Sequence, residues 1–435
     1  MTELGRTLRR LPGRSPRELL GRLAQLGRAE IERLGFGGTD RSVEPACLMS
    51  ELGYASEMEG AADLLARFKA RAETGPFSVF HDPARSLDVL QTRWPEAADR
   101  VLRRAERIES GRFDLLGYEA LDFGDPVDWH LDPVHGVRAP LVHWSRVPYL
   151  DVEAVGDHKV IWELNRHQYL VDLGRAYWLS GDERWARLFA AHVGSWMEAN
   201  PPKRGINWAS SLELGLRSIA WLWALQFFLD SPSLTPALFG RLVAWLRLQG
   251  AHVERFVSTW FSPNTHLTGE ALALVYLGEL LPELPEASRW REKGRAWMRE
   301  ALRKQVRADG GYFEQSTHYG RYTADFYLHL SLLDGGATAR GGEGGTMDRG
   351  RVVDLVDHLV ALTRPDGRTP RIGDEDGGKL LFLDDRPLDD FRSRFLTPAA
   401  LLGRGEWASV GGQPRAEHVW LLGPEAPDRL ADLEA

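Results

Sequence analysis

Helical segments that alternate with short breaks, from Lys159 to about residue 365, constrain the fold of this chain more than any other feature. The breaks are stretches such as NPPKRG, DSPSLTP and LPELP, whose proline, glycine and serine residues end and cap helices. A row of antiparallel helical hairpins with a spacing near ~50 residues stays open as a solenoid or curls into a ring. The sequence therefore predicts an all-α fold, with helices at about 160–179, 182–199, 209–229, 235–260, 266–281, 286–306, 320–334 and 350–363.

Charge and hydropathy limit the kinds of partner that we expect this chain to bind. The chain has 435 residues, 43% of them hydrophobic, and 54 basic against 62 acidic side chains, which gives a net charge of −8. No basic block interrupts this pattern, so nucleic acid is not expected as a partner. No segment reaches the ~20 apolar residues of a membrane span, and none resembles the core of a signal peptide. The expected location is cytoplasmic, or periplasmic if a signal has been removed.

The N-terminal third gives weaker indications. Cys47 is the only cysteine, which excludes a disulfide framework and a cysteine-based metal site, and we expect a packed thiol. Residues 16–33 have an apolar stripe that includes Leu20 and Leu23, which predicts a packing arm with a solvated basic face or, alternatively, a helix on a membrane surface. Residues 83–157 are rich in Pro, Trp, Asp and Gly and are expected to form an ordered, irregular segment.

An apolar helix with one polar stripe is predicted at residues 210–228, SSLELGLRSIAWLWALQFF. Glu213 and Arg217 lie one turn apart on it, and such a stripe on a buried helix is typical of a cleft lining. An ordinary surface pair is the alternative interpretation. Asn207 and Trp208 precede the helix, at an entrance where side chains often contact ligand.

Two further clusters combine polar and aromatic residues. WELNRHQYL, at residues 162–170, places Arg166 and His167 in the first turns of a predicted helix, where capping and solvation are the simpler explanation. GGYFEQSTHYGRYTADFYLH, at residues 310–329, contains four tyrosines. A tyrosine has an unperturbed pKa near ~10, so it becomes a useful base only beside a cation or a hydrogen-bond donor. His318 and Arg321 are candidates for that role.

The stretch SPNTHLTGE, at residues 262–270, contains an Asn, a His and a Glu within seven residues. Taken alone, Asn264 is an N-cap after Pro263. His266 and Tyr319, taken alone, are satisfied core residues. Their order relative to the other clusters is what favours a site.

Together these motifs resemble the toroid domain of the heparinase II/III-like polysaccharide lyases and of the alginate lyases related to them. The motifs occur in the family's order over about residues 80–400: DWHLDPVHG, HWSRVPYL, GDHKVIWELNRHQYL, GINWASSLELGLRSIAWLWAL, FSPNTHLTGEALAL and FEQSTHYGRYTADFYLH. The resemblance implies an incomplete (α/α) toroid, followed by a C-terminal domain of antiparallel β-sheets, with the active site in the cleft between them. It also implies β-elimination on a uronic acid of an acidic polysaccharide, with no metal and no organic cofactor.

The resemblance also implies roles for residues. Asn264 corresponds to the residue that contacts the uronate carboxylate, His266 to a nearby neutraliser or base, and Tyr319 to the catalytic tyrosine. A neutral amide suits the first role because it stabilises the enolate without holding the ground state too tightly. Glu270 either orients His266 or is a structural partner. The further expected substrate contacts are Asn207, Trp208, Glu213, Arg217, Arg166, His167, Glu270, Arg321 and Gln315.

The chain departs from the family pattern at two places. Gly320 stands where many relatives have a histidine directly after the catalytic tyrosine. After the acidic turn GDEDGG, which we expect to be a solvated loop, the chain lacks the long β-rich continuation of relatives. We therefore expect an N-terminal helical arm and lead-in at 1–79, a toroid at 80–400, and a tail at 401–435 that leads to a missing or separate β-sheet domain.

Other functions stay open at this point. One is a non-catalytic glycan-binding or assembly component of exopolysaccharide biosynthesis, which keeps the cleft without the chemistry. Another is a uronyl C5-epimerase, which shares the proton abstraction but returns a proton to C5. A glycoside hydrolase needs two opposed carboxylates. The sequence shows no persuasive pair, although Glu213, Glu270 and Glu314 are candidates.

Overall fold

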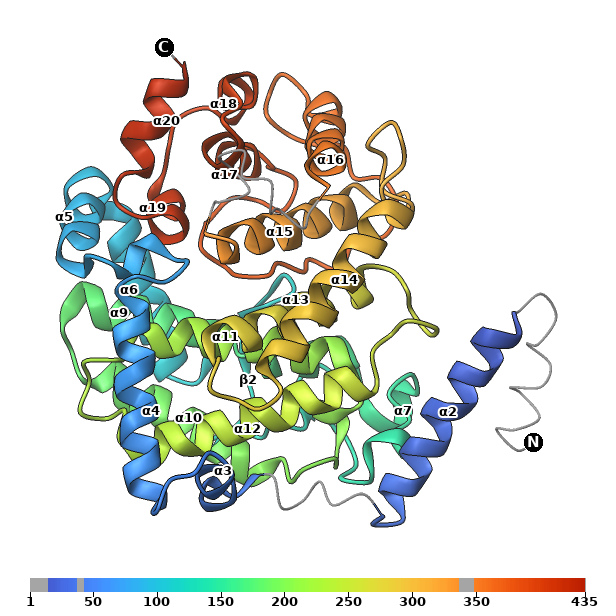
Figure 1. The fold of residues 1–435 in the computed structure, drawn as a ribbon. Coiled ribbons are helices and arrows are strands. Elements are labelled where there is room, and N and C mark those ends of the chain that lie inside the picture. The colour runs from blue at the N-terminus through green and yellow to red at the C-terminus, as the bar shows by residue number, and fades with distance from the viewer. Residues whose placement is uncertain (1–14, 37–42, 336–347, 435) are drawn as a thin grey trace.

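A computed structural model describes residues 15–36, 43–335 and 348–434, so parts of the predicted N-terminal arm, residues 1–14 and 37–42, lie outside the described chain. Helices dominate the described residues and are arranged around a ring (Figure 1). The all-α toroid predicted from the sequence is confirmed. The elements of the N-terminal part are α2 (Pro16–Arg33), α3 (Pro45–Glu51), α4 (Glu57–Ala72), the 3₁₀ helix η2 (Ser78–Phe80), α5 (Pro83–Arg93) and α6 (Pro95–Glu109).

Two short antiparallel hairpins and small helices follow. They are β1 (Arg112–Leu115) with β2 (Tyr118–Asp122), β3 (Leu131–Asp132) with β4 (Val137–Arg138), η3 (Trp144–Arg146) and α7 (Val152–Val155). The prediction of an irregular segment over 83–157 was wrong for its first part, which forms α5 and α6. Pro83 and Pro95 occupy the first helical positions, where the missing N–H costs nothing, so these prolines start helices.

The central helices lie close to their predicted positions. They are α8 (His158–Asn165), α9 (Tyr169–Ser180), α10 (Arg184–Ala199), η4 (Ile206–Trp208), α11 (Ser211–Phe227), α12 (Pro236–Arg255), α13 (Thr265–Leu280), α14 (Ala287–Gln305), α15 (Thr317–Leu333) and α16 (Arg349–Leu362). The single helix predicted at 160–179 is wrong, because the chain breaks between α8 and α9. His167 takes a left-handed conformation there, with φ 59°, and its Nδ1 accepts a hydrogen bond of 2.8 Å from Trp221 Nε1.

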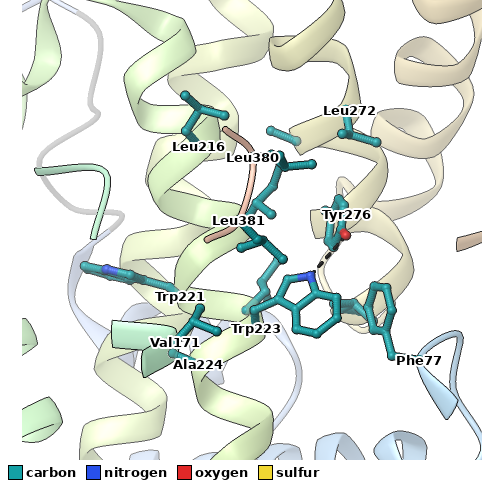
Figure 2. Close-up of a cluster of buried hydrophobic side chains, with 14 of the residues drawn as sticks. Phe77, Val171, Leu216, Trp221, Trp223, Ala224, Leu272, Tyr276, Leu380 and Leu381 are labelled. Carbon is teal, nitrogen blue, oxygen red and sulfur yellow. Dashed lines mark hydrogen bonds between the residues drawn. The ribbon is translucent and has the colours of Figure 1, made fainter. Parts of the chain in front are cut away.

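The hydrophobic core is centred on α11 and the helices that pack against it. Every residue of α11 is buried, and α13 packs against both α11 and α14. Figure 2 shows part of this core, where Trp223 donates a hydrogen bond of 3.1 Å to the Tyr276 hydroxyl. Leu380 and Leu381, which belong to the loop after α16, insert among these helices (Figure 2). The loop is therefore held by the core of the ring.

The C-terminal residues close the ring. Residues 393–434 form α17 (Ser393–Leu402), α18 (Gly405–Gly411), α19 (Ala416–Leu422) and α20 (Ala426–Glu434). Helix α19 packs against η2 and α5, and the Ser78 hydroxyl donates a hydrogen bond of 3.1 Å to the Leu422 carbonyl (Figure 1). At the other end, α4 packs against α12. Packing thus continues across the boundaries that we placed at residues 79 and 400, and those boundaries stay predictions.

Helix α2 forms where the sequence predicts it, but its apolar stripe does not face the body as that of a packing arm would. Its polar side contacts the body: Gln25 donates a hydrogen bond of 2.8 Å to the Val257 carbonyl, and Trp144 Nε1 donates one of 2.7 Å to Glu32. Leu20 and other apolar residues of the stripe are exposed instead. Cys47 is also exposed, so the prediction of a packed thiol was wrong. The inner side of the seven-residue helix α3 is occupied by its buried neighbours Leu48 and Met49.

No helix among the described residues has the length and apolarity to span a membrane.

Candidate active site

A cavity of about 610 Å³ opens beside the N-terminal ends of α11, α13 and α15. The loop after α16, the start of α8 and one side of α2 complete its wall. All three residues predicted to be catalytic, Asn264, His266 and Tyr319, line it, although they lie up to 55 residues apart in the sequence. Of the predicted substrate contacts, Arg166 and Glu213 line it as well.

Asn264 caps helix α13 and faces the cavity. Its Oδ1 accepts a hydrogen bond of 3.1 Å from the His266 backbone N–H, as an N-cap does, and its Nδ2 donates one of 2.8 Å to Glu314. Glu314 is held in turn by the Thr265 hydroxyl, at 2.6 Å. Asn264 can therefore cap the helix and contact a ligand at the same time. The cap fixes the amide, and Nδ2 has a second N–H that can donate to a ligand.

His266 is the candidate general base at the cavity. Its imidazole makes no hydrogen bond to a described residue. Burial lowers its pKa, more than the nearby carboxylates of Glu213 and Glu314 raise it. The ring is therefore neutral at pH 7 and keeps a nitrogen lone pair, which suits a general base.

Tyr319 lies across the cavity on the first turn of α15. Its hydroxyl donates a hydrogen bond of 3.3 Å to Asp376, in the loop after α16. Burial raises the pKa of Tyr319, and the negative charge of Asp376 raises it further. The phenol is therefore protonated at pH 7, which suits a proton donor.

Arg166 supplies positive charge at the cavity wall. It forms a bidentate ion pair with Glu213, at 2.6 and 3.1 Å, and a second ion pair with Glu163 at 2.5 Å. Burial acts to lower the pKa of Arg166, but the charges of Glu213 and Glu163 outweigh it and raise the pKa. Burial raises the pKa of Glu163 to about 7, against the attraction of Arg166. Glu213 and Arg166 are thus paired with each other, and Glu213 makes no ion pair with Arg217.

Several predicted substrate contacts lie in the core instead. Arg217 is fully buried and donates hydrogen bonds to Gln249 and to the carbonyls of Asn165 and Asn207, at 2.8 to 3.1 Å. Asn207 donates to the Trp129 carbonyl at 3.0 Å. These polar groups connect helices to one another, which is why an otherwise apolar helix carries them. Neither residue lines the cavity, so the structure does not bring them to the other site residues, and their contact with substrate stays a prediction.

Other predicted contacts are likewise buried away from the cavity. Trp208 packs in the core against Trp245, and His167 stacks on Trp221. Arg321 is buried and paired with Asp325 at 3.0 Å. None of the three predicted contacts lines the cavity.

Glu270 and Gln315 also lie away from the cavity. Glu270 is buried and accepts hydrogen bonds of 2.6 Å from both the backbone N–H and the hydroxyl of Ser258. Of its two predicted roles, the structure therefore shows that of a structural partner. It anchors the segment that leads to Asn264. Gln315 is exposed, with φ 56°, and lines a smaller neighbouring cavity.

Among the cavity residues that sequence reasoning missed, three carry polar groups of chemical interest. Asp376 belongs to the acidic turn that we expected to be solvated, and the only signal was the flanking glycines, which allow a tight loop. Tyr322, one turn after Tyr319, points a buried hydroxyl without a hydrogen-bond partner at the same cavity. Lys159 contributes a second cation to the wall. Within the described ranges, no three His, Cys, Asp or Glu side chains gather as a metal ion would need.

The fold and this cavity define a class of protein: a helical toroid with a cavity lined by an imidazole, an amide and a phenol. Residues 56–379 match the family model described as the heparinase II/III N-terminus. The chain belongs to the heparinase II/III family.

Two curated relatives are similar in sequence. The heparin-sulfate lyase of Pedobacter heparinus is 24% identical over 327 residues, which cover 73% of this chain and 44% of that protein. The heparin-sulfate lyase of Bacteroides stercoris is 26% identical over 235 residues, which cover 49% and 32%. The chain thus spans less than half the length of these relatives.

Solved structures share the fold. A crystal structure of heparinase III has a TM-score of 0.55 and 18% sequence identity, over 88% of this chain and 54% of that chain. The heparan sulfate lyase from Pedobacter heparinus gives a TM-score of 0.53 and 21% identity, over 83% and 52%. At these identities, the likeness concerns the helical toroid.

Proposed function

We propose that this chain takes part in β-elimination on a polysaccharide that contains uronic acid. The observation that carries the proposal is the meeting of Asn264, His266 and Tyr319 at one cavity, with the neutral base and the protonated acid on different helices. The family membership and the heparin-sulfate lyase relatives support the same chemistry.

The steps follow from the protonation states. The neutral His266 imidazole takes the proton from C5 of the uronate, and the electrons of that bond form the C4=C5 double bond while the bond from C4 to O4 breaks. Tyr319 gives its proton to O4 of the leaving sugar. The free N–H of Asn264 stabilises the carboxylate as it takes on enolate character.

The absorbance of the unsaturated uronate tests this function. The chain is incubated with alginate, heparan-type, chondroitin-type and hyaluronan polysaccharides, and we expect a rise in ultraviolet absorbance with at least one. Asn264→Ala, His266→Ala and Tyr319→Phe should each lose about 3 kcal/mol or more of transition-state stabilisation, as the loss of a preorganised donor or proton carrier does. Tyr118→Phe, an exposed tyrosine in β2, is the matched control and should keep full activity.

Two outcomes would favour another function in place of the lyase reaction. No rise on any polysaccharide, together with binding to one of them, would favour a glycan-binding role. Exchange of the C5 hydrogen with deuterated solvent, without a rise in absorbance, would identify a C5-epimerase.

A further inference from the structure

The loop after α16 is held against the start of α15. The Thr317 backbone N–H donates to the Ile372 carbonyl at 3.0 Å, and the Ser316 hydroxyl donates to the Asp374 carbonyl at 2.6 Å. Further along, the buried Gln168 side chain donates to the Leu380 carbonyl at 2.8 Å. Asp376 lies between these attachment points, so its position relative to Tyr319 is fixed by the fold.

Asp376 connects two side chains of α15. One oxygen, Oδ2, accepts the hydrogen bond of 3.3 Å from the Tyr319 hydroxyl. The other, Oδ1, lies 3.5 Å from Nε2 of the buried His318 and accepts a hydrogen bond of 3.2 Å from the Gly378 backbone N–H. The Gly378 N–H therefore fixes the carboxylate, and the His318 imidazole lies beside it without a hydrogen bond of normal geometry.

The contact of the other ring nitrogen, Nδ1, indicates which nitrogen of a neutral His318 carries the proton. Nδ1 lies 3.4 Å from Nη2 of Arg321, and a guanidinium only donates, so Nδ1 is the acceptor. The proton of a neutral His318 is then on Nε2, which faces Asp376. Arg321 itself is fixed, because it donates to Asp325 at 3.0 Å and to the Gly378 carbonyl at 2.6 Å. The Nε2–H of His318 is thus directed toward Asp376 at 3.5 Å, and Asp376 also accepts the hydrogen bond from Tyr319.

We propose that Asp376, held by His318, positions the Tyr319 hydroxyl as the proton donor of the cleft. The proposal rests on the proposed lyase function and assigns two positioning residues within it. Neither needs to touch substrate: Asp376 orients the phenol, and His318 orients Asp376.

Charges around the phenol agree with this role. Besides Asp376, the carboxylates of Asp374 and Glu314 surround Tyr319, and they disfavour a phenolate. Burial acts to raise the pKa of Asp376, but the neighbouring His318 imidazole and the charge of Arg166 outweigh it and lower the pKa, so Asp376 is ionised. At 3.3 Å the bond from Tyr319 to Asp376 is long, so a sugar oxygen that enters the cavity can take the proton in its place.

A titration of tyrosinate absorbance tests the positioning without any substrate. Each protein is compared with its own Tyr319→Phe counterpart, so that only the ionisation of Tyr319 is counted. Asp376→Asn should lower the pKa of Tyr319 by about one unit, because it removes the adjacent negative charge. Asp374→Asn makes the same change two residues away on an exposed side chain and should lower it by less than about half a unit. Equal shifts in the two variants, or no shift with Asp376→Asn, would overturn the proposal.

A second pair of variants addresses His318 through catalysis. His318→Leu should reduce kcat about tenfold with little change in KM, because the carboxylate loses its donor. His318→Gln places an N–H near the same position and should restore most of that loss. A Gln variant as impaired as the Leu variant would show that His318 only fills space, and would overturn its assignment.

The two proposals can fail separately. If the wild-type chain is inactive on every polysaccharide but the titration gives the predicted difference, the proposed function is wrong and the positioning role stands. If the chain is active and the titration shows no difference between Asp376→Asn and Asp374→Asn, the function stands and the positioning role is wrong.

Discussion

The buried carboxylate of Glu270 contributes a pH-dependent part of the stability of this protein. Burial raises its pKa to about 8, against the two hydrogen bonds from Ser258. The folded state thus holds a proton that the unfolded state releases near its ordinary value of 4.5. The stabilisation is fully present below pH 4.5 and is lost as the pH rises through about 8.

Glu270→Gln should remove this dependence, because an amide does not ionise: its oxygen can accept from the Ser258 N–H while its NH2 donates to the Ser258 hydroxyl oxygen. Between pH 5 and pH 8.5, the wild type should lose at least about 1 kcal/mol more unfolding free energy than the variant, since each pKa unit is worth about 1.4 kcal/mol. Urea unfolding at both pH values measures the difference. Glu198→Gln, on an exposed position of α10, should behave as the wild type does. Parallel curves for Glu270→Gln and the wild type would contradict the assignment.

At the scale of residues, the sequence predicted three residues that line the cavity better than it predicted their surroundings. Asn264 and His266 could be found because both belong to one short motif at a helix start. Asp376 could not, because its role depends on a loop that reaches Tyr319 from 57 residues further along the chain. Arg217 was expected at the cavity but lies in the core, because a polar residue on an apolar helix looks the same in sequence whether it faces a ligand or three buried carbonyl and amide groups.

At the scale of elements, Arg217 connects α11 to three other segments. Because it satisfies Gln249 of α12 and the carbonyls of Asn165 and Asn207, Arg217→Met should leave buried acceptors without partners and cost about 3 kcal/mol or more in unfolding free energy. Arg187→Met, on an exposed position of α10, is the control and should change stability by less than about 0.5 kcal/mol.

Arg217→Lys separates this structural role from the substrate contact that we first expected. Lysine keeps the charge but cannot reach all three acceptors, so the variant should be less stable, and its KM should stay unchanged once it is assayed below its unfolding temperature. A raised KM with normal stability would return Arg217 to the binding site.

Helix periodicity explains why most elements were predictable. The apolar stripes of α10 to α16 and the breaks between them are local features, so the sequence shows them directly. The break at His167 was not visible, because the left-handed turn is maintained by Trp221, a residue of another helix. Helices α5 and α6 were missed because their first prolines were interpreted as signals of irregular structure.

At the scale of the whole molecule, the ring depends on a contact between residues that are far apart in sequence. Beside the bond from Ser78 to Leu422, ion pairs join Arg85 to Glu425 at 2.8 Å and Arg93 to Asp428 at 2.7 Å. These pairs are exposed and contribute little. The packing of α19 is what closes the ring, and no local sequence pattern predicts it.

Gly423, which ends α19, tests that closure. Its φ is 87°, and a Cβ atom there would lie 2.8 Å from Ser78 Cβ, so Gly423→Ala combines backbone strain with a clash across the closure. Gly412 ends α18 with φ 72° and has no atom near its missing Cβ, so Gly412→Ala carries the strain alone. We expect Gly423→Ala to lower the unfolding free energy by about 2 kcal/mol more than Gly412→Ala. Hydrogen exchange should then rise in both η2 and α19, since they separate together. Equal losses in the two variants, with unchanged exchange in η2, would show that the ring is held elsewhere.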